Sequence, residues 1–238
     1  DITLTARWTK NDFKINYNLN GGINDGNNPS GFNVSDTDII INNPTKTGYT
    51  FIGWSGTGLT DNTKNLVIAA GTWGDLSFTA NWQANNYTIT YDYNDGATAK
   101  TTQNVTFDSS YKLVVPTRNG YKFSGWFFGN EKITDGMYKT PSDITLKAAW
   151  EIITYTIDYN LNGGSVINGN PVKYTVETET FTLGNPTKTG YSFAGWVFGD
   201  SDVKNLTVVI EKGHFGDLTF TACYDANKYT LSFNENGG

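Results

Sequence analysis

The sequence predicts a mostly β protein that is built from tandem modules of about 70 residues and forms an elongated rod. The first observation is a heptapeptide, Gly-Tyr-x-Phe-x-Gly-Trp, that begins at Gly48, again at Gly120 and a third time at Gly190. The second is a composition with 15% aromatic residues and 26 glycines, which suits strands and tight turns. The third is a linker of constant length, four residues, between successive modules, which favours one repeated pose of neighbours.

The module boundaries follow from this self-similarity. Three whole repeats span residues 13–82, 87–150 and 155–224. Residues 1–8 match the end of each repeat, and residues 229–238 match its beginning. We therefore expect the closing strand of a preceding repeat at one end, the opening strand of a following repeat at the other, and a longer array as the source of this chain.

Each repeat is expected to open on a strand. In the second repeat Tyr87, Ile89 and Tyr91 alternate with polar residues, and this period of two is typical of a half-buried strand. An Asn-Gly-Gly or Asn-Asp-Gly turn then follows, formed by residues that tolerate positive φ. A second strand is expected after a variable loop, near residues 38–41, 103–107 and 172–178.

The heptapeptide comes after a proline-containing turn and is expected to form the next strand. Alternation puts Tyr121 and Phe123 on one face, so a plain strand would send Trp126 to the opposite face. We predict a β-bulge at Gly125 that returns Trp126 to the core. Because so small a module needs its large side chains for packing, we interpret the heptapeptide as core and not as a sugar-stacking platform. The predicted core residues are Gly48, Tyr49, Phe51, Gly53, Trp54, Gly120, Tyr121, Phe123, Gly125, Trp126, Gly190, Tyr191, Phe193, Gly195 and Trp196.

The segment between the motif tryptophan and the last strand is irregular, and either a strand or one short helical turn fits it. The closing strand is clearer. In the second repeat Ile144, Leu146, Ala148 and Trp150 are expected to point inward, with polar or small residues between them.

With these features together, the module resembles the Listeria–Bacteroides repeat, the family that includes the B repeat of internalin B. The shared pattern comprises the opening strand with its turn, Pro-Thr-x-x-Gly-Tyr-x-Phe-x-Gly-Trp, and a closing aliphatic-x-aliphatic-x-Ala-x-Trp. It covers all three repeats and both flanking segments, with Tyr224 in place of the last Trp. The resemblance implies a mostly β module related to the β-grasp fold, found in tandem in exported surface proteins of bacteria and some archaea. It implies no catalytic residues.

Charge and hydropathy argue against several functions. The net charge is −6 with no basic run, so nucleic acid is not an expected partner. No apolar stretch is long enough for a membrane span, so we expect no membrane insertion by this segment. The single cysteine, Cys223, excludes an intramolecular disulfide.

Chemistry-bearing residues do not form a recognisable catalytic, cofactor or metal set. His214 is the one histidine, and a triad or metal site needs converging partners. The acidic and amide residues at 24–38 lack the spacing of a calcium loop and are interpreted as turn residues. Contact with a ligand is more plausible where the repeats differ. The candidate ligand-contacting residues are Trp73, Phe128, Tyr138, Phe198 and Phe215.

These observations favour a non-enzymatic stalk in a large adhesin-like protein on the surface of a prokaryotic cell, which projects a distal functional domain and needs no cofactor. Its expected partners are the neighbouring repeats of the same chain. One alternative is that the repeats themselves bind a host or neighbouring-cell protein or glycan through variable loops. Another is self-association into surface filaments through exposed strand edges. An enzyme is the least expected class, because converging acid, base or nucleophile groups are absent from the pattern.

Overall fold

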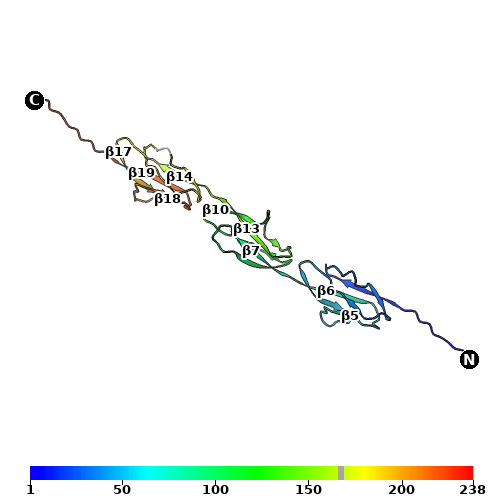
Figure 1. The fold of residues 1–238 in the computed structure, drawn as a ribbon. Helices are drawn as coiled ribbons and strands as arrows, with labels where there is room; N and C mark the ends of the chain where they lie inside the picture. The colour runs from blue at the N-terminus through cyan, green and yellow to red at the C-terminus, as the bar shows by residue number, and fades with distance from the viewer. Residues whose placement is uncertain (166–168, 238) are drawn as a thin grey trace. The chain divides into compact units, whose positions relative to one another are not determined.

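The computed structural model describes residues 1–165 and 169–237, and those residues form strands, turns and no helix (Figure 1). The mostly β fold class with repeated sheet modules is therefore confirmed. A relation to the β-grasp fold stays a prediction.

The first repeat contains a four-stranded sheet and a separate two-stranded ribbon. The sheet has the order β2-β1-β6-β4, and the ribbon pairs β3 with β5. The strands are β1 (Asp12–Asn18), β2 (Gly31–Asn33), β3 (Ile39–Ile41), β4 (Tyr49–Gly56), β5 (Leu66–Ile68) and β6 (Leu76–Ala84).

The second repeat has a five-stranded sheet of order β11-β10-β13-β7-β8 and a ribbon of β9 and β12. Its strands are β7 (Asn86–Asp92), β8 (Thr101–Thr106), β9 (Ser110–Tyr111), β10 (Tyr121–Phe128), β11 (Glu131–Ile133), β12 (Gly136–Met137) and β13 (Ile144–Ile152).

The third repeat returns to a four-stranded sheet, β15-β14-β19-β17, with a ribbon of β16 and β18. Its strands are β14 (Tyr155–Asn160), β15 (Lys173–Tyr174), β16 (Phe181–Thr182), β17 (Tyr191–Phe198), β18 (Val209–Ile210) and β19 (Leu218–Ala226).

The opening and closing strands of each repeat form a parallel pair in the middle of the sheet. In the first repeat Ile15 faces Leu76 in this ladder, and the second and third repeats have the same register. An aspartate at the start of each closing strand accepts a hydrogen bond from a backbone N–H of the opening strand, which ties the two strands before the ladder begins. These bonds join Lys14 N to Asp75 Oδ1 (2.8 Å), Thr88 N to Asp143 Oδ1 (2.8 Å) and Thr156 N to Asp217 Oδ1 (2.7 Å).

The second strand of the first repeat differs from the prediction. The opening strand pairs with Gly31–Asn33, where the rings of Phe13 and Phe32 lie 5.6 Å apart. A turn then reverses the chain, closed by a hydrogen bond from Asp36 N to Asn33 O of 3.1 Å. Residues 38–41, predicted to form the second strand, instead contribute the third strand, β3, which pairs with β5 in the ribbon. The predictions near residues 103–107 and 172–178 overlap β8 and β15.

The irregular segment after the motif tryptophan forms short strands and no helical turn in any repeat. It supplies β5 in the first repeat, β11 and β12 in the second, and β18 in the third. Each pairs in an antiparallel manner with a neighbour, so the alternative of a strand is the correct one.

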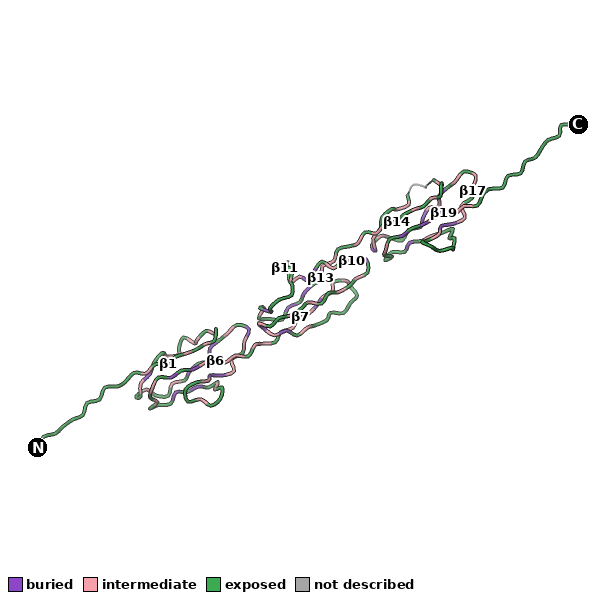
Figure 2. The backbone as a smooth tube through the Cα atoms, turned by 180° about the vertical axis from the view of Figure 1, so that it is seen from behind, coloured by how far each residue is buried: buried purple, intermediate pink, exposed green. Residues whose placement is uncertain are grey.

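The terminal segments carry strand patterns but form no ladder. Trp8 is 92% exposed and Tyr229 is 80% exposed, and both segments are green throughout in Figure 2. An isolated strand leaves its backbone groups without partners, and none of the described strands lies beside residues 1–8 or 229–237. The strands expected there are therefore not formed in this structure, and Gly238 lies outside the described residues.

Buried residues are purple along the backbone in Figure 2, and in the first and third repeats they form a core that contains the motif tryptophan. In the first repeat Trp54 packs with Ile15, Leu66 and Phe78. In the third, Trp196 packs with the equivalent Ile157 and Phe220. Burial of one such aromatic side chain removes roughly 150–250 Å² from water, worth on the order of 4–6 kcal/mol, which a module of this size needs.

The chain divides into two compact units. One comprises Asp1–Val114 with Trp126–Lys147, and the other comprises Val115–Gly125 with Ala148–Gly238. The division passes through the second repeat, because β10 and β13 contribute residues to both units. Every site described below lies within one unit.

Candidate functional site

The three motif tryptophans are buried and do not form a surface platform. Trp54 is 0% exposed, and Trp126 and Trp196 are each 1% exposed. The register of the motif strand shifts between Phe51 and Gly53, and the third repeat has the same shift. The first and third repeats therefore have, at Gly53 and Gly195, the bulge predicted at the equivalent Gly125. The bulge glycines have φ of 137° (Gly53), 141° (Gly125) and 135° (Gly195).

A basic residue three positions before each motif tyrosine stacks on that ring. The Lys46 Nζ lies 4.1 Å from the Tyr49 ring centroid and donates a 2.8 Å hydrogen bond to Asn20 O in the turn after the opening strand. Lys188 repeats the arrangement over Tyr191 at 4.5 Å. In the sequence, this contact is indicated only by a basic residue (Lys, Arg or Lys) at the same position of each repeat. That recurrence does not show which ring the basic residue contacts. Tyr191 is an exposed residue, so its prediction as a core residue is wrong.

The first junction between repeats is built on Gly48 and Tyr49. The Phe107 ring lies so close to Gly48 that an added Cβ would meet it at 2.4 Å. The Tyr49 ring packs edge-on against Phe107, with centroids 5.6 Å apart, and its hydroxyl donates to Asp108 Oδ2 at 2.7 Å. Asn85, in the linker, connects the two sides because its N–H donates to Gly48 O (3.0 Å) and its C=O accepts from Phe107 N (2.9 Å).

The second junction repeats this construction with different side chains. An added Cβ on Gly120 would meet Val176 Cγ1 at 2.1 Å. The Tyr121 hydroxyl donates to Glu177 Oε1 at 2.5 Å, and Arg118 stacks 3.8 Å from the Tyr121 ring centroid. In both junctions, therefore, an apolar side chain covers the motif glycine, and the motif tyrosine donates to the acidic residue that comes directly after the apolar residue in the sequence.

The junction contacts shift the ionisation of their groups. The hydrogen bond to Asp108 raises the pKa of Tyr49, since the carboxylate favours the neutral, donating hydroxyl. The hydrogen bond from Lys139, and next the one from Tyr49, lowers the pKa of Asp108. At the second junction the hydrogen bond to Glu177 raises the pKa of Tyr121.

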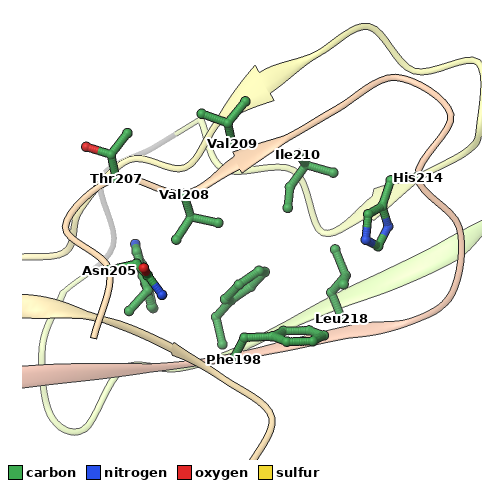
Figure 3. A pocket seen from close by; sticks show the side chains of 10 residues that line it. Phe198, Asn205, Thr207, Val208, Val209, Ile210, His214 and Leu218 are labelled. Carbon is green, nitrogen blue, oxygen red and sulfur yellow. The ribbon is translucent and has the colours of Figure 1, made fainter. Parts of the chain in front are cut away.

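The third repeat carries an apolar pocket of about 320 Å³ between its ribbon and its main sheet. Figure 3 shows Val208, Ile210 and Leu218 pointing into the hollow, with Phe198 at its floor and His214 at one side. The His214 Nδ1 is 2.9 Å from the Tyr174 hydroxyl, so the imidazole is fixed by a neighbour.

Trp196 lines the same pocket, and its indole nitrogen, like that of Trp54 in the first repeat, is buried without a hydrogen-bond partner among the described residues. In the second repeat the equivalent Trp126 Nε1 donates to Val114 O at 2.6 Å. The matching carbonyl in the third repeat, Gly184 O, accepts from the Asn170 side chain at 2.9 Å. An asparagine thus occupies the acceptor that the indole uses in the second repeat.

The candidate ligand-contacting residues are not brought together. Trp73 is 79% exposed and Phe215 is 50% exposed, each in the loop before the closing strand. Phe128 and Phe198 are half exposed at the ends of β10 and β17, and Phe198 alone of the five lines the pocket. The prediction that Tyr138 is a ligand-contacting residue is wrong. Tyr138 is 2% exposed, because its ring packs on Tyr87 and Tyr111 and its hydroxyl donates to Ser142 O, so it belongs to the core.

Within residues 1–165 and 169–237, no group of three or more His, Cys, Asp or Glu side chains is placed to hold a metal ion. The same part of the chain has no helix long and apolar enough to cross a membrane.

Comparison with known proteins finds relatives that are much longer than this chain. It is 28% identical over 241 residues to a protein of Evansella cellulosilytica named as a Gly-rich membrane protein, covering 100% of this chain and 27% of that relative. It is 28% identical to a second protein of the same organism, named as a membrane protein, of which it covers 35%. It is 30% identical over 116 residues to internalin H of Listeria monocytogenes, covering 47% of this chain and 20% of that protein. The chain therefore spans about a third or less of the length of these relatives.

A family model described as the Listeria-Bacteroides repeat domain matches residues 13–80, 87–149 and 155–222. These matches cover most of the chain and fall on the three sheets described above. The chain belongs to the Listeria-Bacteroides repeat family and contains three tandem copies of its domain.

Proposed function

We propose that this chain is a structural segment of a prokaryotic cell-surface protein, in which tandem repeats act as a non-enzymatic stalk that holds a distal domain away from the cell envelope. The observation that carries the proposal is the pair of junctions of the same construction, each joining a Gly-Tyr face to an apolar-acidic pair. Contacts of this kind restrain the pose of one repeat on the next, which a spacer needs. The names of the membrane-protein and internalin relatives support a location at the cell envelope or surface.

Small-angle X-ray scattering of the 238-residue chain tests the stalk. We expect an elongated particle, and a double variant Tyr49→Phe with Tyr121→Phe should broaden the distribution of interatomic distances, because each junction loses its tyrosine–carboxylate hydrogen bond. Tyr191→Phe is the matched control, since Tyr191 occupies the same motif position but is 42% exposed. A compact particle for the unaltered chain would contradict the proposal.

A second function, binding of an extracellular glycan or protein by the third repeat, is favoured by the largely apolar pocket that the half-exposed Phe198 lines. Apolar side chains form most of the pocket lining, and Asn205, Thr207 and His214 add polar groups, which is the usual composition of a ligand site.

Retention of the chain on glycan arrays and on cells tests this second function. Phe198→Ala should abolish retention, whereas Phe128→Ala should leave it unchanged, because Phe128 ends the equivalent strand of the second repeat with similar exposure, 47% against 49%. Equal retention of both variants, or none for the unaltered chain, counts against binding by this pocket.

A further inference from the structure

The third repeat carries the same Gly-Tyr face that forms the two internal junctions. Asn227 N donates to Gly190 O at 2.9 Å, as Asn85 N does to Gly48 O at 3.0 Å. Ser192 Oγ donates to Asn227 Oδ1 at 2.6 Å, as Thr50 Oγ1 does to Asn85 Oδ1 at 2.6 Å. The linker after the third repeat is thus held against its motif strand in the manner of the linker after the first.

The difference is that this face is uncovered. None of the described residues has an atom within 4 Å of a Cβ added on Gly190, whereas a Cβ on Gly48 or Gly120 would collide with an apolar side chain. Tyr191 is 42% exposed. In the internal junctions the covering side chains, Phe107 and Val176, are only 8% and 9% exposed.

We propose that the face formed by Lys188, Gly190, Tyr191 and Asn227 is a docking surface for one kind of partner, a further repeat of this family that follows Asn227 and whose turn after its second strand carries an apolar residue followed by Asp or Glu. The apolar side chain covers Gly190 and packs on the Tyr191 ring. The carboxylate accepts from the Tyr191 hydroxyl. The argument for this occupant is continuity with both internal junctions, where Phe107–Asp108 and Val176–Glu177 make these contacts.

Charge supports the choice of an acidic residue. Lys188 Nζ lies 4.5 Å from the centroid of the Tyr191 ring. Its positive charge is therefore close to the tyrosine whose hydroxyl would donate to the carboxylate. At the first junction the hydrogen bonds from Lys139 and Tyr49 lower the pKa of Asp108 most, and the charge of Lys46, the equivalent of Lys188, lowers it further. A carboxylate docked at Tyr191 would therefore meet a favourable field, which a neutral side chain would not use.

The surface should select among repeats, because not every repeat carries the acidic residue. The equivalent turn of the first repeat is Val34–Ser35, and Val34 is 44% exposed. The nearest carboxylate, on Asp36, already accepts from Asn33 N at 2.8 Å within its own turn. A repeat of this type should cover Gly190 but cannot supply the carboxylate to Tyr191.

Two extended chains test the proposal. In both, residues 1–228 are kept, and the sequence from 229 onward is replaced by a second copy of residues 87–150, with a Phe-Asp turn, or of residues 13–82, with a Val-Ser turn. Hydrogen exchange of the third-repeat amides, including Asn227, is measured with and without Tyr191→Phe. In the Phe-Asp chain we expect the substitution to lower protection about fivefold or more, as for loss of a hydrogen bond to a charged acceptor. In the Val-Ser chain and in the original chain it should have little effect.

Asp108→Asn in the appended copy should remove most of the effect of Tyr191→Phe, since the charged acceptor is lost. Dispersed NMR signals show that the appended repeat is folded. If it is folded and Tyr191→Phe changes protection to a similar degree in all three chains, the proposal is wrong. If the appended copy of 87–150 does not fold, a copy of residues 155–224, whose turn carries Val176–Glu177, takes its place with the same expectation. The inference rests on the junctions that also support the stalk, yet the readouts differ, because exchange reports local docking and scattering reports overall dimensions.

Discussion

At the scale of single residues, the first glycine of the motif serves two purposes that can be separated. Gly120 and Gly190 have nearly the same φ, 78° and 80°, so a side chain would strain the backbone equally at both. Only Gly120 lies under a neighbouring side chain, with Val176 Cγ1 at 2.1 Å from the position of an added Cβ. The pair therefore isolates the steric demand of the junction from that of the turn.

Gly120→Ala should destabilise the chain more than Gly190→Ala. The positive φ costs about 1 kcal/mol at either position. Overpacking against Val176 adds about 1–3 kcal/mol at Gly120 alone. Urea denaturation of the three proteins, the unaltered chain and the two variants, measures the difference.

The double variant Gly120→Ala with Val176→Ala provides the control for this comparison. Removal of the valine methyl groups should recover part of the loss seen in Gly120→Ala, because the collision is with the side chain and not with the backbone. Equal destabilisation by Gly120→Ala and Gly190→Ala would show that Val176 does not constrain the glycine.

At the scale of strands, the sequence predicted those elements in which apolar and polar residues alternate over several consecutive positions. The opening strand and closing strand alternate over enough residues to define both their type and their buried face, and Ile144, Leu146 and Ala148 are buried as expected. A bulge could be predicted from the sequence because Gly125 interrupts an alternation that would otherwise place Trp126 on the face away from the core.

Elements held by partners distant in sequence could not be predicted in the same way. Residues 38–41 read as a strand, but their partner, Leu66–Ile68, is fixed by folding and not by the local pattern. Tyr138 looked like a variable loop residue, whereas packing on Tyr87 buries it. The junction contacts join residues 59 and 56 positions apart, Tyr49 to Asp108 and Tyr121 to Glu177, and no periodicity connects such pairs.

At the scale of the whole molecule, each repeat contributes one tyrosine from its opening strand that is partly buried (Tyr17, Tyr159) or buried (Tyr91). The Tyr17 hydroxyl donates to Pro29 O at 3.0 Å, and Tyr159 donates to Pro171 O at 2.8 Å. Desolvation raises the pKa of both to about 12. Desolvation also raises the pKa of Tyr91, the equivalent residue of the second repeat. The three repeats therefore share one sensitivity to alkali.

The free energy of unfolding should fall as the pH rises from 10 to about 12. Over this range the unfolded chain loses protons from these tyrosines near their ordinary pKa of 10, while the folded chain retains them. Because the unfolded state then binds fewer protons, stability decreases with pH, and the contribution is fully present only below pH 10. Urea midpoints at pH 8, 10 and 11, with parallel spectrophotometric titration of tyrosine, measure the effect.

The double variant Tyr17→Phe with Tyr159→Phe should be less stable than the unaltered chain at pH 8, because each substitution removes a hydrogen bond to a proline carbonyl and leaves that carbonyl without its donor. Its stability should nevertheless depend less steeply on pH between 10 and 12, since two of the three shared ionisations are gone. Tyr229→Phe is the matched control, because its side chain is 80% exposed in the folded chain and should change neither the midpoint nor the slope. If the pH dependence of stability is unchanged in the double variant, Tyr17 and Tyr159 do not cause the alkaline sensitivity. Tyr49 and Tyr121 are then the next residues to substitute, because hydrogen bonds to carboxylates raise the pKa of these tyrosines as well.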